Sequence, residues 1–327
     1  MLIENFSPFS GQHCETTATG SLLKSLGIEM SEAMLFGIGE GLGYIYWDMK
    51  NMAFPFLGGR VKPDLLTNKI VNNLHLRMDV KETSSQKKAW ENVKQNIDKG
   101  IIVGLKLDSY YLDYFTNKVH FAGHYVAMYG YDDHIAYLVD TKQQGGLVKT
   151  SLETLALARS EKGPMSSKNL SYTIKKKEVI PNLKDVITKA IKNNAIAYAN
   201  PPITNLGYKG IKKTSVEINK WFERSKNIEN DLVLTATLME RGGTGGSLFR
   251  NIYRDFLKEC LSIFDNALLQ NAYNLFTEIA PMWEETSKLI KKAGETHELL
   301  FLNQASDLLL ELSNKEYDAM KQLSKIS

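Results

Sequence analysis

The residues with the clearest chemical potential in this chain are a cysteine near its start and a histidine and an aspartate in its middle. Cys14, His124 and Asp140 are the residue types that form a nucleophile, its general base and a carboxylate that orients the base. A histidine bonded to a carboxylate is held in one tautomer, and its second ring nitrogen is then ready to accept a proton. The three residues predict acyl chemistry at a cysteine, provided that the fold brings them together.

A β-hairpin is predicted to carry the histidine and the aspartate. Two runs rich in β-branched and aromatic residues flank a Gly/Asp turn between Gly123 and Asp140. If the loop holds an odd number of residues, either 131–133 or 130–134, then position 124 faces position 140, and facing positions carry Cβ atoms about 4.5–5.5 Å apart. A two-residue loop would place the two side chains on opposite faces. The hairpin can therefore deliver an imidazole with a carboxylate beside it.

A helix is predicted to begin at the cysteine. Apolar or small residues recur every four positions from Cys14 through Leu26, and Gly27 is a natural stop. Cys14 would then lie in the first turn, where unpaired N–H groups and the helix dipole stabilise a thiolate and can also hold an oxyanion. The alternative is that Cys14 is only the first core residue of this apolar stripe.

Composition excludes several classes of function. The chain has 327 residues, 43% of them hydrophobic and 24% charged, and a net charge of +3, which is typical of a globular protein of two domains. The charge is too small to indicate nucleic acid or an anionic membrane, and neither a signal peptide nor a membrane span is expected. The two cysteines, Cys14 and Cys260, are interpreted as free thiols in a reducing cytoplasm, with Cys260 in the core.

No cofactor or metal is predicted. His120 and His124 are four residues apart, but no third ligand with convincing spacing accompanies them. The glycine-rich segment 37–43 superficially resembles a dinucleotide fingerprint; however, a helix-start pattern rather than a strand precedes it. Its glycines, and those of segment 56–60, are expected to let the backbone turn tightly beside a cleft.

A second glycine-rich loop, 241–246, lies between predicted helices. Its open N–H groups, with Arg241 and Arg250 nearby, could hold a phosphate or carboxylate, or the loop could be a flexible interhelical turn. Arg60 could bind a substrate carboxylate or phosphate, or simply lie on the surface.

Element patterns predict an α+β fold. Residues 1–150 are expected to form a catalytic domain with an antiparallel sheet, 151–180 a connecting helix and strand, and 181–327 a helical domain covering the active-site cleft.

Five blocks carry a resemblance to a known family: Gln12 to Thr17, Gly39 to Gly43, Phe56 to Arg60, Gly123 to Val126, and Gly243 to Gly246 with Phe249 and Arg250. Together they resemble the butirosin-biosynthesis BtrH family, in which an associated helical domain follows the N-terminal domain. The His/Asp hairpin also resembles that of papain-like, bacteriocin-processing cysteine peptidases. The resemblance implies a papain-like N-terminal fold and acyl transfer from a carrier-protein thioester to an amine.

The resemblance also implies roles for individual residues. Gln12 is expected beside the oxyanion, although papain-like enzymes carry their glutamine several residues before the cysteine, and here it is two residues before. The residues expected to bind substrate are His13, Glu40, Arg60, Tyr125, Arg241, Thr244 and Arg250. A small-molecule amine acceptor and an acyl carrier protein are the expected partners, and a homo-oligomer is left open.

Three functions compete at this stage. An acyltransferase predicts that an amine outcompetes water for the acyl-enzyme. A cysteine peptidase or amidase predicts hydrolysis. A non-catalytic binding protein on the same scaffold predicts that Cys14 is buried and unreactive.

Overall fold

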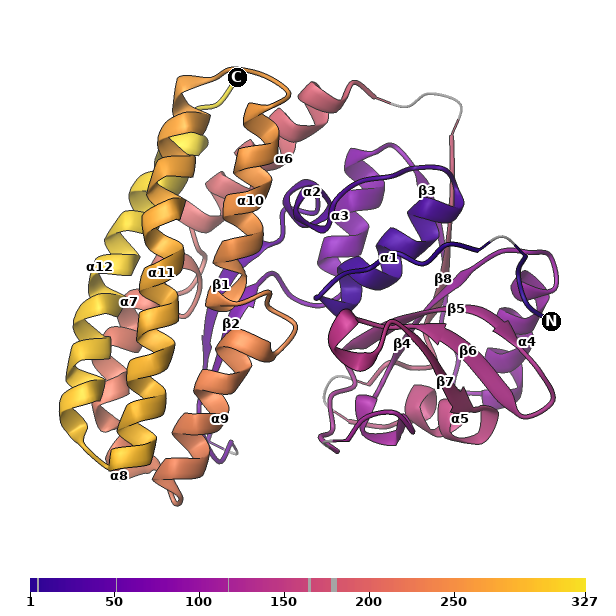
Figure 1. The fold of residues 1–327 in the computed structure, drawn as a ribbon, viewed down its shortest axis with the longest axis horizontal. Coiled ribbons are helices and arrows are strands. Elements are labelled where there is room, and N and C mark those ends of the chain that lie inside the picture. The colour runs from indigo at the N-terminus through magenta and orange to yellow at the C-terminus, as the bar shows by residue number, and fades with distance from the viewer. Residues whose placement is uncertain (5, 51, 117, 164–165, 178–180) are drawn as a thin grey trace. The chain divides into compact units, whose positions relative to one another are not determined.

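The chain folds into two compact units in a computed structural model, which describes residues 1–4, 6–50, 52–116, 118–163, 166–177 and 181–327. The first unit comprises Met1–Leu35 and Pro63–Pro181, and the second comprises Phe36–Lys62 and Asn182–Ser327 (Figure 1). The sequence predicted boundaries at 150 and 180 instead, and the end of that predicted connecting segment, residues 178–180, lies outside the described residues.

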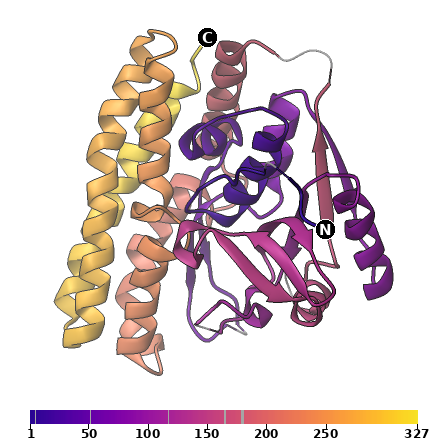
Figure 2. The same cartoon turned by 45° about the vertical axis from the view of Figure 1, so that its right-hand side comes forward.

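The first unit is an antiparallel sheet with helices packed on it. Its elements, with α2 ending in the second unit, are α1 (Cys14–Ser25), α2 (Glu32–Ile38), α3 (Leu65–Asn73), β3 (Arg77–Lys81), α4 (Gln86–Ile97), β4 (Val103–Leu107), β5 (His124–Tyr131), β6 (Ile135–Val139), β7 (Leu147–Ser151), α5 (Leu152–Ser160) and β8 (Ser171–Lys175). The six strands lie in the order β3-β8-β4-β5-β6-β7, and each neighbouring pair is antiparallel (Figure 1, Figure 2).

Apolar side chains on alternate strand positions build the core of this unit. Val126 and Met128 of β5 pack with Leu138 of β6 against residues of α4 and α5, and all three are 0% exposed. Successive strand residues point to opposite faces of the sheet, and β5 is buried at all of its first five positions, so both of its faces are covered there. Helix α1 packs against β5 and β4, which brings the start of α1 into the same unit as the hairpin.

A hairpin of β5 and β6 is present as predicted, but neither the predicted loop, 131–133 or 130–134, nor the predicted register is found. Its turn, 132–135, lies between the paired residues Tyr131 and Ala136, and in it the Asp132 carboxylate accepts the backbone N–H groups of His134 and Ile135. Ala127 pairs with Val139, so in this register Asp140 is across from position 126 rather than 124. The predicted pairing of 124 with 140 is therefore wrong by two positions.

A β-bulge explains this difference. The register shifts between Met128 and Gly130, where Tyr129 is an extra residue on β5. A bulge sets two residues of one strand against one residue of the other, which changes the side-chain parity beyond it. Near the loop, Gly130 pairs with Tyr137; had that register continued, positions 124 and 140 would lie on opposite faces. The bulge restores them to one face as diagonal neighbours, which long side chains can bridge.

The second unit is mostly helical, as predicted for the C-terminal part of the chain. Its elements are β1 (Leu42–Trp47), β2 (Phe56–Arg60), α6 (Leu183–Ala199), α7 (Gly207–Glu217), α8 (Trp221–Arg224), α9 (Ile228–Arg241), α10 (Arg250–Leu261), α11 (Ala267–Thr296) and α12 (Leu299–Leu323). Helix α11 packs against α12, α9 and α10, and the two strands form a separate antiparallel hairpin (Figure 1). No helix in the described ranges is both long and apolar enough to span a bilayer.

A buried ion pair ties the β1–β2 hairpin to these helices. The guanidinium of Arg250 donates to Glu316 through Nε and Nη2, each over 2.8 Å, and both residues are 0% exposed. Nη1 of Arg250 also donates to the carbonyl of Gly59 in β2. On β1, the Tyr44 hydroxyl bonds that of Thr214. These contacts explain why residues 36–62 belong to the helical unit despite their position early in the sequence.

The α+β fold class, the antiparallel sheet and the helical C-terminal part are thus confirmed. The papain-like identity of the first unit stays a prediction.

Candidate active site

A buried histidine–aspartate pair lies where β5 begins and β6 ends. The His124 Nε2 atom lies 2.8 Å from Oδ2 of Asp140, and the two residues are 6% and 1% exposed. The second oxygen of Asp140, Oδ1, accepts the backbone N–H of Thr141 over 2.6 Å. The carboxylate is therefore fixed at both oxygens, and it orients the imidazole with Nδ1 as the remaining ring nitrogen.

Cys14 is the first residue of α1 and interacts with this histidine. Cys14 is 8% exposed, and its side chain is close enough to His124 to act on the charge of the imidazole. Burial opposes the charged imidazolium, but Asp140 and Cys14 outweigh it and raise the pKa of His124 to about 10. The structure thus places the three predicted catalytic side chains in one cluster.

The residues just before Cys14 are held by a carboxylate. Both oxygens of Glu32 accept the backbone N–H of Gln12 over 2.9 Å, and Oε1 also accepts the N–H of His13 and the hydroxyl of Thr16. Because Glu32 begins α2, its four hydrogen bonds fix the start of α1 relative to α2. They stabilise the helix entry as an N-cap carboxylate does.

A backbone hydrogen bond links the segment before Cys14 to the segment after Asp140. The N–H of Lys142 donates to the carbonyl of Gly11 over 2.9 Å. Gly11 has no room for a side chain, since a Cβ there would lie 2.6 Å from the Thr17 hydroxyl and 2.8 Å from the Glu32 carboxylate. The segments before Cys14 and after Asp140 are consequently in direct contact.

The surroundings of the cluster are aromatic and closed. The hydroxyl of Tyr114 donates to Asp140 Oδ2 over 2.7 Å, and the ring of Phe115 meets the His124 ring edge-on, with centroids 5.2 Å apart. Burial, followed by the charge of Asp140, raises the pKa of Tyr114 well above its ordinary value, so this phenol stays a donor. Tyr114 was missed as a site residue; the only signal was a polar-aromatic loop at the end of a strand.

The predicted oxyanion groups have different environments. The Cys14 N–H lies in the first turn of α1, and the N-cap His13 makes no side-chain cap. The first N–H groups of a helix have no partner within it and are suited to an oxyanion. The Gln12 side chain is exposed, whereas its N–H is bound to Glu32. His13, predicted to bind substrate, is 3% exposed at the helix start.

Tyr125, another predicted substrate residue, is part of a polar network instead of an open surface. It is 2% exposed, and its hydroxyl donates to Asp64. Burial, then the charges of Glu15 and Asp64, raises its pKa far above the ordinary tyrosine value. Lys106 also donates to Asp64, over 2.7 Å. The Tyr125 hydroxyl therefore already has an acceptor within the first unit.

The remaining predicted substrate residues belong to the second unit. Glu40 is 6% exposed, has a left-handed backbone with φ of 52°, and accepts from the Asn193 amide over 3.1 Å. Arg60 is half-buried and donates to the carbonyl of Val61. Arg241 is exposed at the end of α9.

The second glycine-rich loop is an ordered turn. The Thr244 hydroxyl donates to the carbonyl of Met239 and accepts the N–H of Gly246, and Thr244 is 3% exposed. Three residues in succession, 247–249, have φ between 47° and 75°, in the left-handed region that non-glycine residues rarely adopt. The guanidinium of Arg250 is bound to Glu316 and to the carbonyl of Leu248. The guanidinium N–H groups of Arg250 therefore donate to acceptors within the protein.

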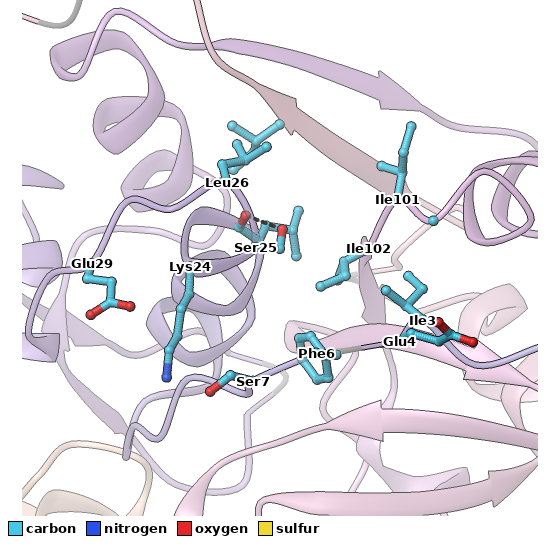
Figure 3. Close-up of a pocket in the computed structure, with 13 residues that line it drawn as sticks. Ile3, Glu4, Phe6, Ser7, Lys24, Ser25, Leu26, Glu29, Ile101 and Ile102 are labelled. Carbon is cyan, nitrogen blue, oxygen red and sulfur yellow. Dashed lines mark hydrogen bonds between the residues drawn. The ribbon is translucent and has the colours of Figure 1, made fainter.

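A cavity of about 400 Å³ lies elsewhere in the first unit, toward the C-terminal end of α1 (Figure 3). Its lining includes Ile3, Phe6, Leu22, Lys24, Glu29 and Ile102. Cys14, His124 and Asp140 do not line this cavity, so it is separate from their cluster. Within the described ranges, no three His, Cys, Asp or Glu side chains are grouped to hold a metal ion.

Comparison with protein families assigns both halves of the chain. Residues 13–141 match the family model described as butirosin biosynthesis protein H, N-terminal, and residues 153–323 match a domain of unknown function, DUF4872. The chain belongs to the BtrH-like family. In this BtrH-like chain, Cys14, His124 and Asp140 all fall within the first match. Comparison with curated proteins gives no match.

Proposed function

We propose that this BtrH-like protein is a cysteine acyltransferase that moves an acyl or aminoacyl group from a thioester to an amine. The observation that carries the proposal is the cluster of Cys14, His124 and Asp140: a buried cysteine at the start of a helix acts on an imidazole whose Nε2 is 2.8 Å from a buried carboxylate. Membership of a family named for a biosynthesis protein supports an enzyme. A papain-like fold of the first unit is part of the same proposal.

In the first half-reaction, His124 takes the proton of Cys14, and the thiolate attacks the carbonyl carbon of the thioester. The oxyanion of the tetrahedral intermediate is stabilised by the Cys14 N–H, with Gln12 as the proposed second donor. Collapse breaks the bond to the leaving thiol, which takes the proton from His124. The product of this step is an acyl group in thioester linkage to Cys14.

In the second half-reaction, an amine attacks the acyl-Cys14 carbonyl and gives its proton to His124. The carbon–sulfur bond breaks and the thiolate is restored. Asp140 remains a carboxylate throughout and stabilises the imidazolium. A small-molecule amine is the proposed acceptor, and an acyl carrier protein is the proposed carrier of the donor.

Thiol release from an aminoacyl N-acetylcysteamine thioester tests the nucleophile. The Cys14→Ala protein should lose at least about a thousandfold in rate relative to wild type, because the covalent route is removed. Cys260→Ala is the matched control, since Cys260 is 0% exposed in α10, away from the triad residues in sequence and unit. Undiminished thiol release by Cys14→Ala would overturn the proposal.

Adding an amine separates the two enzymatic alternatives. With a small-molecule primary amine present, and after subtraction of the reaction without protein, a transferase yields mainly the amide, whereas a peptidase or amidase yields mainly the free acid. A binding protein on this scaffold yields neither, and its Cys14 would resist alkylation by iodoacetamide at neutral pH.

A further inference from the structure

We infer that Tyr114 is a positioning residue of the triad, which sets the basicity and orientation of His124 through Asp140. The inference deepens the proposed function and rests on it for its catalytic meaning. The Tyr114 hydroxyl contacts the Asp140 carboxylate, which lies behind the proposed base.

The first support is that two donors share one oxygen. Oδ2 of Asp140 accepts both His124 Nε2, over 2.8 Å, and the Tyr114 hydroxyl, over 2.7 Å. A phenol that donates to a carboxylate withdraws negative charge from the oxygen that stabilises the imidazolium. It also prevents the carboxylate from rotating away. Tyr114 therefore fixes the geometry of the pair while it moderates the basicity of His124.

The second support is that Tyr114 is itself anchored. The neighbouring Asp113 carboxylate accepts from the hydroxyl of Thr150 over 2.8 Å, the N–H of Ser151 over 2.9 Å and the hydroxyl of Thr154 over 3.0 Å. These partners lie where β7 ends and α5 begins. The loop that carries Tyr114 is thus attached to the sheet and to a helix.

The third support is that the same segment contacts both members of the pair. Phe115 meets the His124 ring at 85°, and Tyr114 reaches Asp140. The charged or titratable groups that act on His124 are Asp140 and Cys14, and those that act on Tyr114 are Asp140, Asp113 and Cys14. Segment 113–115 therefore contacts both His124 and Asp140, and the Tyr114 hydroxyl makes its polar contact.

The test is a titration that needs no turnover. In the full-length protein with ¹⁵N-labelled histidine, the midpoint of His124 is followed by NMR, together with the pH profile of Cys14 alkylation by iodoacetamide. Tyr114→Phe removes only the hydroxyl, so the midpoint should move upward by roughly half a pH unit or more. Thioester turnover should fall about tenfold in kcat with little change in KM.

Tyr111→Phe is the matched control. Tyr111 lies in the same loop but donates to Glu161 instead of the triad, so its removal should leave the His124 midpoint unchanged. A second variant carries 3-fluorotyrosine at position 114, a stronger donor that keeps the ring and hydroxyl, and it should move the midpoint downward.

Opposite shifts in these two variants would establish the positioning role. Unchanged midpoints in both, or in the fluorinated protein if Tyr114→Phe does not fold, would overturn it. The outcome is distinguishable from failure of the proposed function, because the histidine titration can respond to Tyr114 even if Cys14→Ala retains full turnover.

Discussion

The backbone N–H of Lys142 lies 2.9 Å from the carbonyl oxygen of Gly11. Gly11 precedes Cys14 by three residues and Lys142 follows Asp140 by two. The bond therefore connects the two chain segments whose relative position decides whether Cys14 meets the imidazole that Asp140 orients. Cys14 and Asp140 thus lie on segments that this backbone contact already holds together.

Removing that N–H should reduce the reactivity of Cys14 more than it reduces stability. In Lys142→Pro the donor is lost, and we expect the free energy of unfolding to fall by about 1 kcal/mol. The alkylation rate of Cys14 at neutral pH should fall about tenfold, because the thiol and imidazole are less well aligned. Lys142→Ala keeps the N–H and should behave as wild type; equal losses in both variants would show that the side chain, not the backbone bond, matters.

The Asp140–His124 pair should make stability depend on pH. The pKa of His124 is raised in the folded protein to about 10, above its unfolded value of about 6.5. The stability that this difference contributes is fully present below about pH 6.5 and is lost as pH rises through the folded value, since the folded state alone holds the proton in between. Asp140→Asn removes a main favourable partner, so its deficit relative to wild type should be largest near pH 6 and shrink toward pH 10.

Urea unfolding of both proteins at pH 6, 8 and 10 measures this deficit. A gap that grows with pH would contradict a charged imidazole held by Asp140.

Glu32 should stabilise the entry to α1. Glu32→Ala leaves the N–H groups of Gln12 and His13 without their carboxylate acceptor, and hydrogen bonds to charged groups contribute about 1.5–3 kcal/mol. We expect a loss of about 2 kcal/mol in urea unfolding. Glu29→Ala, an exposed carboxylate a few residues earlier, should change stability by less than about 0.5 kcal/mol; similar losses in the two variants would be evidence against the cap.

The buried pair of Arg250 and Glu316 should be essential for the second unit. Glu316→Gln leaves the guanidinium without its counter-charge at 0% exposure, and breaking a buried pair typically costs about 3–5 kcal/mol. Thermal unfolding should show this loss. The exposed pair of Lys288 and Glu284 is the control, and Glu284→Gln should cost less than about 1 kcal/mol. A small effect at Glu316 would mean that solvent reaches the pair.

Much of this architecture was predictable because local patterns and tertiary structure agree. The helix at Cys14, with Gly27 just beyond its end, and the presence of a hairpin between Gly123 and Asp140 follow from periodicity and turn chemistry. The exact pairing did not follow, since Tyr129 is as good a strand former as its neighbours and nothing local marks it as a bulge. The sequence could therefore predict that His124 and Asp140 meet, but not through which register.

Side-chain contacts between residues far apart in the sequence could not be predicted either. Arg250 was predicted to bind a substrate anion. Its actual acceptor, Glu316, is 66 residues away along the chain, and local sequence patterns do not indicate contacts at that separation. Tyrosines at a strand end more often close a core than orient a carboxylate, so Tyr114 carried no distinguishing signal. The grouping of residues 36–62 with the helices depends on the same kind of distant contact, which periodicity cannot report.

Peptide mass spectrometry after exposure to an aminoacyl N-acetylcysteamine thioester, without an amine present, tests the central claim most directly. The account predicts one acyl group on the peptide that contains Cys14, removed when an amine is added and missing in Cys14→Ala. An unmodified Cys14 peptide in a protein that still consumes the thioester, or an acyl group that persists in Cys14→Ala, would contradict it.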